Sequence, residues 1–165
     1  MLCLEYCPKG DDPVSVNQSN RQIVFRLATD AVDISGLLHI TFLGHKIEMD
    51  LNNTYVDTDS YCQAQFEEAD NIETVSCVAS SGFDSDNAWM TSGAFLEYNV
   101  TFESWPSFPM ENNFFSHNGN PDLSDFTCDI SEVTLSGGAK RECTLSDAVN
   151  TEVTGKIIFT PSLFF

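Results

Sequence analysis

Residues 94–102 read Ala-Phe-Leu-Glu-Tyr-Asn-Val-Thr-Phe and carry the clearest periodicity in the chain. Every second position is apolar: Ala94, Leu96, Tyr98, Val100 and Phe102. Between them, Glu97, Asn99 and Thr101 are polar and would face the other way. Because successive side chains of a β-strand point to opposite faces, this alternation predicts a strand with one buried face and one wet face.

The same two-residue period recurs along the rest of the chain. Residues 38–42 and 47–51 both alternate and flank Gly44, which predicts two strands joined by a short turn. Helical signals are scarce, and only residues 59–70 fit a short helix. Further strands, rich in Val, Ile, Thr and Phe, are expected at 23–27, 72–78, 126–130, 133–135 and 153–159.

Many short strands separated by Gly, Pro and Asn turns are typical of a sandwich. We therefore expect an all-β protein, an antiparallel β-sandwich stapled by disulfides, with little or no helix. Residues 1–20 form an N-terminal arm in this interpretation, and residues 21–165 form a single domain. That domain contains a long crossover loop around 105–122 and a terminal apolar strand at 153–165.

Six cysteines and three Asn-x-Ser/Thr sequons indicate the same compartment independently. Disulfides persist in oxidising surroundings, and N-linked glycans are added only on the secretory route, so we expect an extracellular or cell-surface glycoprotein. The short paired spacings of zinc sites are absent, which favours disulfides. The cysteines are Cys3, Cys7, Cys62, Cys77, Cys128 and Cys143. The sequon asparagines are Asn17, Asn52 and Asn99.

The sequence does not fix how six cysteines pair. The spacing favours local bridges, because two pairs are each fifteen residues apart. A bridge that closes a loop of this length stabilises a fold by roughly 3 kcal/mol in the entropic account. The expected bridges are Cys3–Cys7, Cys62–Cys77 and Cys128–Cys143.

The formal net charge is −18, yet a hydrophobic content of 42% and thirteen Phe exclude an acidic disordered tail. Such a surface repels phosphates and anionic headgroups, which excludes nucleic acid binding and electrostatic docking to membranes. No segment reaches the roughly 18 apolar residues of a transmembrane helix, and residues 1–8 are too short and interrupted for a signal peptide. The acidity indicates a soluble, self-repelling surface, with calcium or a cationic partner as the alternatives.

Catalytic signatures are absent, and we expect no enzyme. The chain has neither the G-x-S-x-G elbow of serine hydrolases nor the H-E-x-x-H motif of metalloproteases. Its three histidines are His39, His45 and His117, of which the first two are expected at the surface of a strand and a turn. With 25 acidic residues, paired carboxylates arise by chance.

Residues 84–87, Asp-Ser-Asp-Asn, begin like the calcium loop of an EF-hand. The pattern then fails, because Ala88 occupies the fifth position and Trp89 the sixth, where the loop needs glycine. A looser calcium site is the alternative to an acidic surface turn. Its candidate ligands are Asp84 and Asp86, together with Asp30 or Asp33.

Residues 23–30 (Ile-Val-Phe-Arg-Leu-Ala-Thr-Asp) and 34–44 (Ile-Ser-Gly-Leu-Leu-His-Ile-Thr-Phe-Leu-Gly) resemble the opening strands of the PLAT (LH2) β-sandwich. The run from 72–75 through 82–89 to 94–102 resembles that family's strand, acidic loop with Trp, and next strand. The resemblance covers about 80 residues, and the family's Thr-Gly-Asp signature appears only as Ala-Thr-Asp at 28–30. It implies a non-catalytic sandwich that binds lipid or protein partners, sometimes with calcium.

Two functions follow as expectations. Extended terminal segments can add to another subunit's open sheet edge, and a contact that does not close generates a filament. We therefore expect a structural protein that forms a homo-oligomer, fibre or surface layer by terminal strand addition; the alternative is that the final segment is the last strand of its own sandwich. The candidate assembly residues are Leu2, Leu4, Ile157, Phe159, Leu163, Phe164 and Phe165.

The alternative is a PLAT-like or lectin-like binding module of a secreted or cell-surface protein, with a calcium dependence. This alternative predicts an exposed aromatic patch. The patch would contain Trp105, Phe108, Phe114 and Phe115.

Overall fold

The computed structural model describes residues 20–31, 33–84, 93–106, 121–136 and 140–148 of the chain. The elements in chain order are β1 (Arg21–Thr29), β2 (Asp33–Phe42), β3 (His45–Asp50), α1 (Asp59–Glu67), β4 (Thr74–Asp84), β5 (Gly93–Ser104), the short 3-10 helix η1 (Leu123–Asp125), β6 (Phe126–Asp129), β7 (Val133–Ser136) and β8 (Arg141–Asp147).

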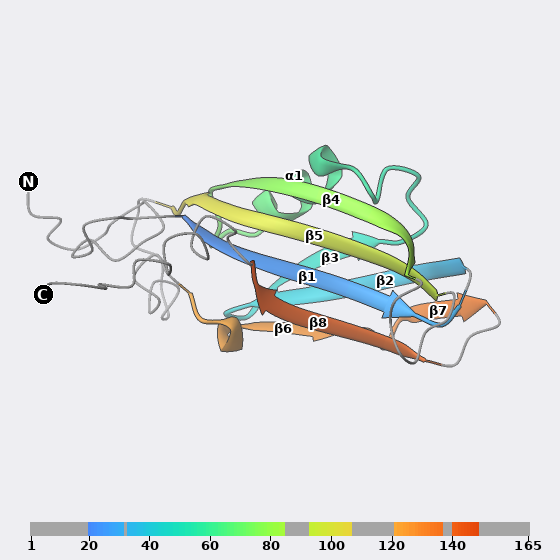
Figure 1. Ribbon diagram of the computed structural model, residues 1–165. Coiled ribbons are helices and arrows are strands. Elements are labelled where there is room, and N and C mark those ends of the chain that lie inside the picture. The colour runs from blue at the N-terminus through green and yellow to red at the C-terminus, as the bar shows by residue number, and fades with distance from the viewer. Residues whose placement is uncertain (1–19, 32, 85–92, 107–120, 137–139, 149–165) are drawn as a thin grey trace, which may run out of the picture.

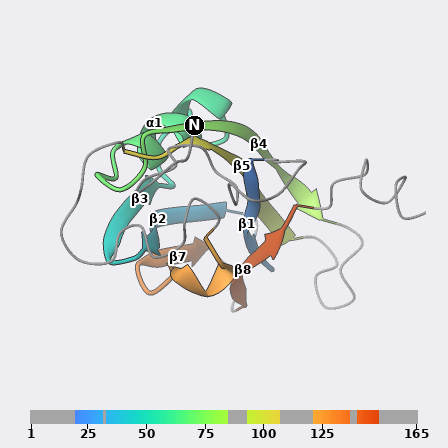
Figure 2. The same cartoon turned by 90° about the vertical axis from the view of Figure 1, so that its left-hand side faces the viewer.

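Two antiparallel sheets face each other and enclose the core (Figure 1). The first sheet has the strand order β4-β5-β1-β8, and the second has the order β3-β2-β6, with β7 pairing to the first part of β2. Figure 2 shows α1 beside β3 and β4, and β7 and β8 on the other side of the sandwich. The predicted antiparallel sandwich is confirmed, and helix in the described ranges is confined to α1 and η1.

The alternation predicted for residues 94–102 is confirmed in β5, which lies between β4 and β1. Leu96, Tyr98, Val100 and Phe102 are buried, whereas the polar residues between them are only half-buried. On the neighbouring strand, Phe25 pairs with Tyr98 and points into the same core. The inner face of the first sheet is therefore continuous from β5 to β1.

Stacked aromatic rings join the two sheets. Phe102 of β5 stacks on Trp105 with ring centroids 5.1 Å apart, and Phe42 of β2 stacks on Phe126 of β6 at 4.4 Å. Phe42 also meets Trp105 at 5.6 Å, which connects the two stacks. Burying each of these rings contributes about 1.5–3 kcal/mol relative to leaving it in water.

The predicted turn between two strands is confirmed at Leu43 and Gly44. Both residues have positive φ, 46° and 92°. Two consecutive positive φ angles are the signature of a type I′ turn, whose twist matches that of the flanking strands. The turn sets the register in which Phe42 pairs with His45, so the inward residues of β2 meet those of β3.

Helix α1 closes one long side of the sandwich, between the edge strands β3 and β4. Thr58 caps the helix, because its side-chain oxygen accepts a hydrogen bond from the Tyr61 N–H. Cys62 and Phe66 are four residues apart, so they share one face of the helix, and both are fully buried. The disulfide Cys62–Cys77 then ties α1 to β4.

A second disulfide, Cys128–Cys143, joins β6 to β8 on the opposite long side, with a Cα–Cα distance of 6.2 Å. The first sheet therefore has a covalent tie at both of its edges, to α1 and to β6, and both predicted fifteen-residue pairings are confirmed. The predicted pair Cys3–Cys7 lies outside the described residues.

Strand β8 was absent from the strands expected from the sequence. Of its seven residues, only Cys143 and Leu145 are apolar, and Arg141, Glu142 and Asp147 are charged. A short alternation bounded by charges gives too weak a signal for a strand. The register with β1 nevertheless places Cys143 opposite Leu27, on the core side.

Replacing Gly36 with Ala is expected to destabilise the fold by about 2 kcal/mol or more. Gly36 has φ of 92°, and a Cβ there would lie 2.1 Å from the Glu132 carbonyl oxygen. The matched control is Gly44→Ala, which has the same φ but no atom within 4 Å of the added Cβ. This control should cost only about 1 kcal/mol, the conformational term alone. Chemical denaturation measures both, and equal losses would contradict the steric account.

Candidate functional site

The outer edge of β4 is covered by acidic side chains. The N–H groups of Val75 and Ala79 point away from β5 and donate to the carboxylates of Glu67, at 3.1 Å, and Asp59, at 2.7 Å. Both carboxylates belong to α1. Two outward N–H groups of this edge are therefore already bonded, and the negative charge beside them opposes the addition of another strand.

The edge of β8 is different. The backbone bonds from the Ala148 N–H to Gln22 and from the Asp30 N–H to Lys140 show that even-numbered residues of β8 face β1. Odd-numbered residues therefore direct their N–H and C=O groups away from the sheet. Within the described residues β8 pairs with β1 alone. Within the described part of the chain these outward groups have no strand partner.

The side chains next to this edge leave part of the core accessible. Phe25 and Leu27 of β1 are each 1% exposed, whereas their partners Leu145 and Cys143 are only half-buried. More half-buried apolar side chains lie on η1, on β6, on the turn after β6 and on β7, in that order: Leu123, Cys128, Ile130 and Leu135. We call β8 with these rim residues the β8 edge.

One end of the β8 edge is tied down. The Arg141 guanidinium donates a hydrogen bond to the Val133 carbonyl oxygen of β7. Further along, the disulfide holds Cys143 to Cys128, and the Asp147 carboxylate forms an ion pair with Arg21 of β1 at 2.5 Å. These contacts involve side chains, so within the described residues the outward backbone groups of Cys143, Leu145 and Asp147 stay unpaired.

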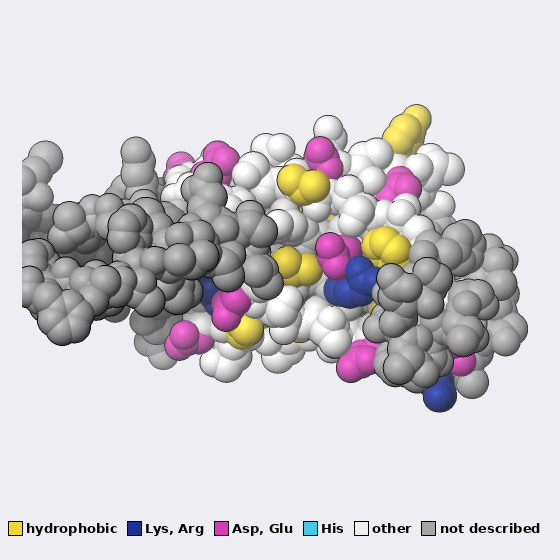
Figure 3. Space-filling view, in the orientation of Figure 1, with side chains coloured by type: hydrophobic (Ala, Val, Ile, Leu, Met, Phe, Trp, Pro, Cys, Tyr) yellow, Lys and Arg dark blue, Asp and Glu magenta, His cyan; other side chains and the backbone are white. Residues whose placement is uncertain are grey.

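The outer face of the first sheet carries mostly uncharged polar surface over β1 and β5 (Figure 3). Near its middle, Arg26 lies 4.2 Å above the Phe95 ring and bonds Glu97 at 2.7 Å. Asn99 also belongs to this face, between Val24 and Val78 on the neighbouring strands. Among the described residues near the middle of this face, the ionisable side chains of Arg26 and Glu97 are paired with each other. The face therefore offers mainly contact area.

The three predicted glycan acceptors differ in accessibility. Asn52 is exposed after β3, where its Nδ2 donates to Asp50 at 2.8 Å. Asn99 faces outward as expected, but it is half-buried, and its carboxamide oxygen is buried with no partner in the described part of the chain. Asn17 lies outside the described residues. Asn52 therefore fits a glycan acceptor better than Asn99.

His39 corrects an expectation from the sequence. It points away from the core as predicted, but its side chain is only 4% exposed. The prediction that it lies at the surface is therefore wrong. The reason is its place on the central strand, where Glu48 of β3 and Asp129 of β6 flank it. Its Nε2 lies 3.3 Å from the Glu48 carboxylate. The Asp129 pKa lies below its ordinary value, mainly because the Ser131 backbone N–H donates to it.

The remaining predicted site residues are not brought together. In the described ranges no group of His, Cys, Asp and Glu side chains could hold a metal ion. Asp30 instead accepts a hydrogen bond from the Lys140 N–H at 2.8 Å. The Asp84 side chain and Asp86 lie outside the described residues, as do all seven predicted assembly residues.

The predicted aromatic patch is wrong at Trp105, which is 1% exposed and belongs to the core. Phe108, Phe114 and Phe115 lie outside the described residues. No helix in the described part is long and apolar enough to span a membrane. Searches with this chain found no matching family model, no similar curated protein and no similar solved structure.

Substituting Asn52 with Gln is expected to remove one N-linked glycan from protein made in a eukaryotic secretory host, because the exposed Asn52 heads an intact sequon. Intact mass before and after enzymatic deglycosylation measures this. The matched control is Asn53→Gln, which changes the neighbouring residue and keeps the sequon. An unglycosylated Asn52 in the parent protein would contradict the assignment.

Proposed function

We propose that this chain is a non-catalytic structural domain of an extracellular or cell-surface protein, and that its copies assemble by strand addition. In this proposal the apolar segment 153–165 of one copy pairs with the β8 edge of the next copy. The observation that carries the proposal is the contrast between the two edges of the first sheet. The β4 edge is bonded to carboxylates, and the β8 edge pairs only with β1 within the described residues.

The composition of segment 153–165 supports its role as the added strand. Val153, Ile157 and Phe159 occupy odd positions; at the even positions between them, Thr154 and Lys156 are polar and Ile158 is apolar. An added strand with this period would lay its apolar side chains over the half-buried rim and leave its polar ones outside. The incoming backbone would meet the outward N–H and C=O groups of β8.

The sealing of β4 supports a head-to-tail arrangement. If β8 is the edge that accepts the strand, each copy contributes one donor and one acceptor to this contact. Such contacts are heterologous, and they generate a filament unless the rotation between copies closes a ring. The two disulfides, and the exposed sequon at Asn52, are compatible with an oxidising compartment.

Truncation after Gly155 is expected to convert the assembled protein to a monomer, because it removes the apolar part of the donor strand. Analytical ultracentrifugation measures the change in mass. A synthetic peptide of residues 153–165 should then bind the truncated chain. A parent protein that is monomeric at every concentration, or a particle mass unchanged by truncation, would contradict assembly.

A matched pair of substitutions tests the edge itself. Leu145→Lys places a charge on the half-buried rim, and charged side chains at an edge oppose strand pairing. Ser146→Lys adds the same charge one residue along, on the outer face of the sheet. The first should prevent assembly and the second should not. Thermal unfolding of both variants verifies that the domain stays folded.

A further inference from the structure

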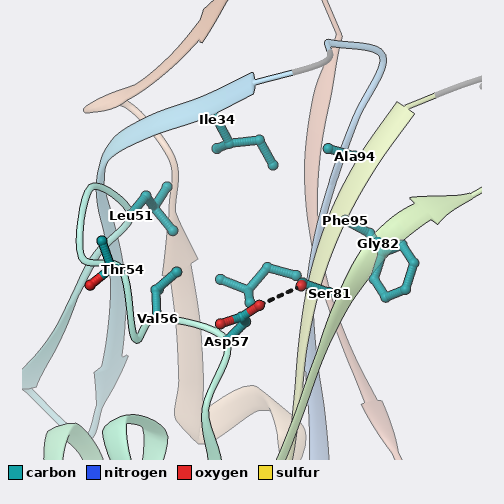
Figure 4. Close-up of a pocket in the computed structure, with 10 residues that line it drawn as sticks. Ile34, Leu51, Thr54, Val56, Asp57, Ser81, Gly82, Ala94 and Phe95 are labelled. Carbon is teal, nitrogen blue, oxygen red and sulfur yellow. Dashed lines mark hydrogen bonds between the residues drawn. The ribbon is translucent and has the colours of Figure 1, made fainter.

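A pocket of about 340 Å³ lies between the two sheets, at the end of the sandwich where β3 ends and β5 begins (Figure 4). Its lining is mixed: Thr54, Asp57 and Ser81 are polar, and most of the other side chains are apolar. Ile34 comes from β2 of the second sheet, Ala94 and Leu96 come from β5, and Leu51 and Val56 come from the connection between β3 and α1. The volume lies near the lower end of the range typical for small-molecule sites.

One carboxylate stands on the rim of this pocket. Asp57 is exposed, and its Oδ2 accepts a hydrogen bond from the Ser81 hydroxyl at 2.8 Å (Figure 4). Its Oδ1 has no hydrogen bond or ion pair within the described part of the chain. No Lys, Arg or His is among the described lining residues. Among the described lining residues, the rim therefore carries a negative charge with no cation beside it, next to the apolar side chains of the pocket.

The wall that carries Asp57 is fixed by its neighbours. The Tyr98 hydroxyl donates to the Val56 carbonyl oxygen at 2.5 Å, and Asp59 accepts from the Ala79 N–H at 2.7 Å. Burial raises the pKa of Tyr98 well above its ordinary range, so its hydroxyl keeps the proton that it donates. A ligand would meet a preformed wall and would not have to order the segment, which favours binding.

We propose that this pocket binds a small organic cation, an ammonium group attached to an alkyl or arylalkyl group. The apolar part would lie between Ile34, Leu51 and Leu96, and the ammonium group would bond the free Oδ1 of Asp57. Charge complementarity identifies the occupant, because an anionic rim on a chain of net charge −18 attracts cations. The proposal is independent of strand addition, since none of the described lining residues belongs to β8.

Isothermal titration calorimetry with three probes tests the chemistry on the full, oxidised chain. The 2-phenylethylammonium ion should bind saturably. Its neutral analogue 2-phenylethanol should bind about tenfold more weakly, because it lacks the charge-assisted hydrogen bond. Methylammonium should show no binding at the same concentrations, because it buries no apolar group. Equal binding of the alcohol, or no saturation by 2-phenylethylammonium, would overturn the proposal.

Three substitutions localise the binding. Asp57→Asn keeps an acceptor for Ser81 but removes the charge, and it should weaken 2-phenylethylammonium binding about tenfold. Asp70→Asn is the control, because it removes the same charge from an exposed residue outside the pocket. Ala94→Leu fills the pocket and should abolish binding, while thermal unfolding verifies the fold. If Asp57→Asn and Asp70→Asn bind alike, or if Ala94→Leu still binds, the site is elsewhere and the proposal fails.

Discussion

The inner faces of the two sheets stay buried only where the long sides of the sandwich are closed against water. The rest of the structure depends on this constraint. The aromatic stacks of Phe42, Phe102, Phe126 and Trp105 supply much of the buried surface. On one side α1 covers the gap, with Cys62 and Phe66 fully buried beneath it. On the other side the described residues leave a disulfide and a half-buried rim.

The connection from β3 through α1 links the closed side to both proposals. Its residues form a pocket wall at Val56, supply Asp57 to the pocket rim, and supply Asp59 to the β4 edge. The hydrogen bond from the Ala79 N–H to Asp59 therefore both fixes the pocket wall and occupies an outward N–H group of the β4 edge. Two acidic residues close in sequence therefore have different partners: Asp57 accepts a hydrogen bond from the Ser81 hydroxyl, and Asp59 accepts one from the Ala79 backbone N–H.

The sequence predicted those parts of the fold whose signal is local. The alternation in residues 94–102, the turn at Gly44 and the two fifteen-residue cysteine pairs depend on neighbours in the chain, and all are confirmed. The predictions that failed depend on residues that lie on neighbouring strands and are distant in sequence. His39 follows the polar face of its strand, and only its central position between β3 and β6 buries it.

The candidate sites were missed for the same reason. A carboxylate that seals an edge, such as Glu67 on the Val75 N–H, looks like any other acidic residue in a chain with 25 of them. The pocket joins residues from β2, β5 and the connection after β3, which no local pattern associates. One signal was present for β8: Cys143 and Leu145 alternate, and the expected pairing of Cys143 with Cys128 placed this segment beside a predicted strand.

Hydrogen exchange of single backbone N–H groups tests most directly whether one edge of the first sheet is sealed and the other accepts a strand. In the chain truncated after Gly155, the account predicts slow exchange at Val75 and Ala79 and nearly unprotected exchange at Cys143, Leu145 and Asp147. In the full chain these three should become protected as the concentration rises. Slow exchange at Leu145 in the truncated chain, or fast exchange at Ala79, would contradict the account.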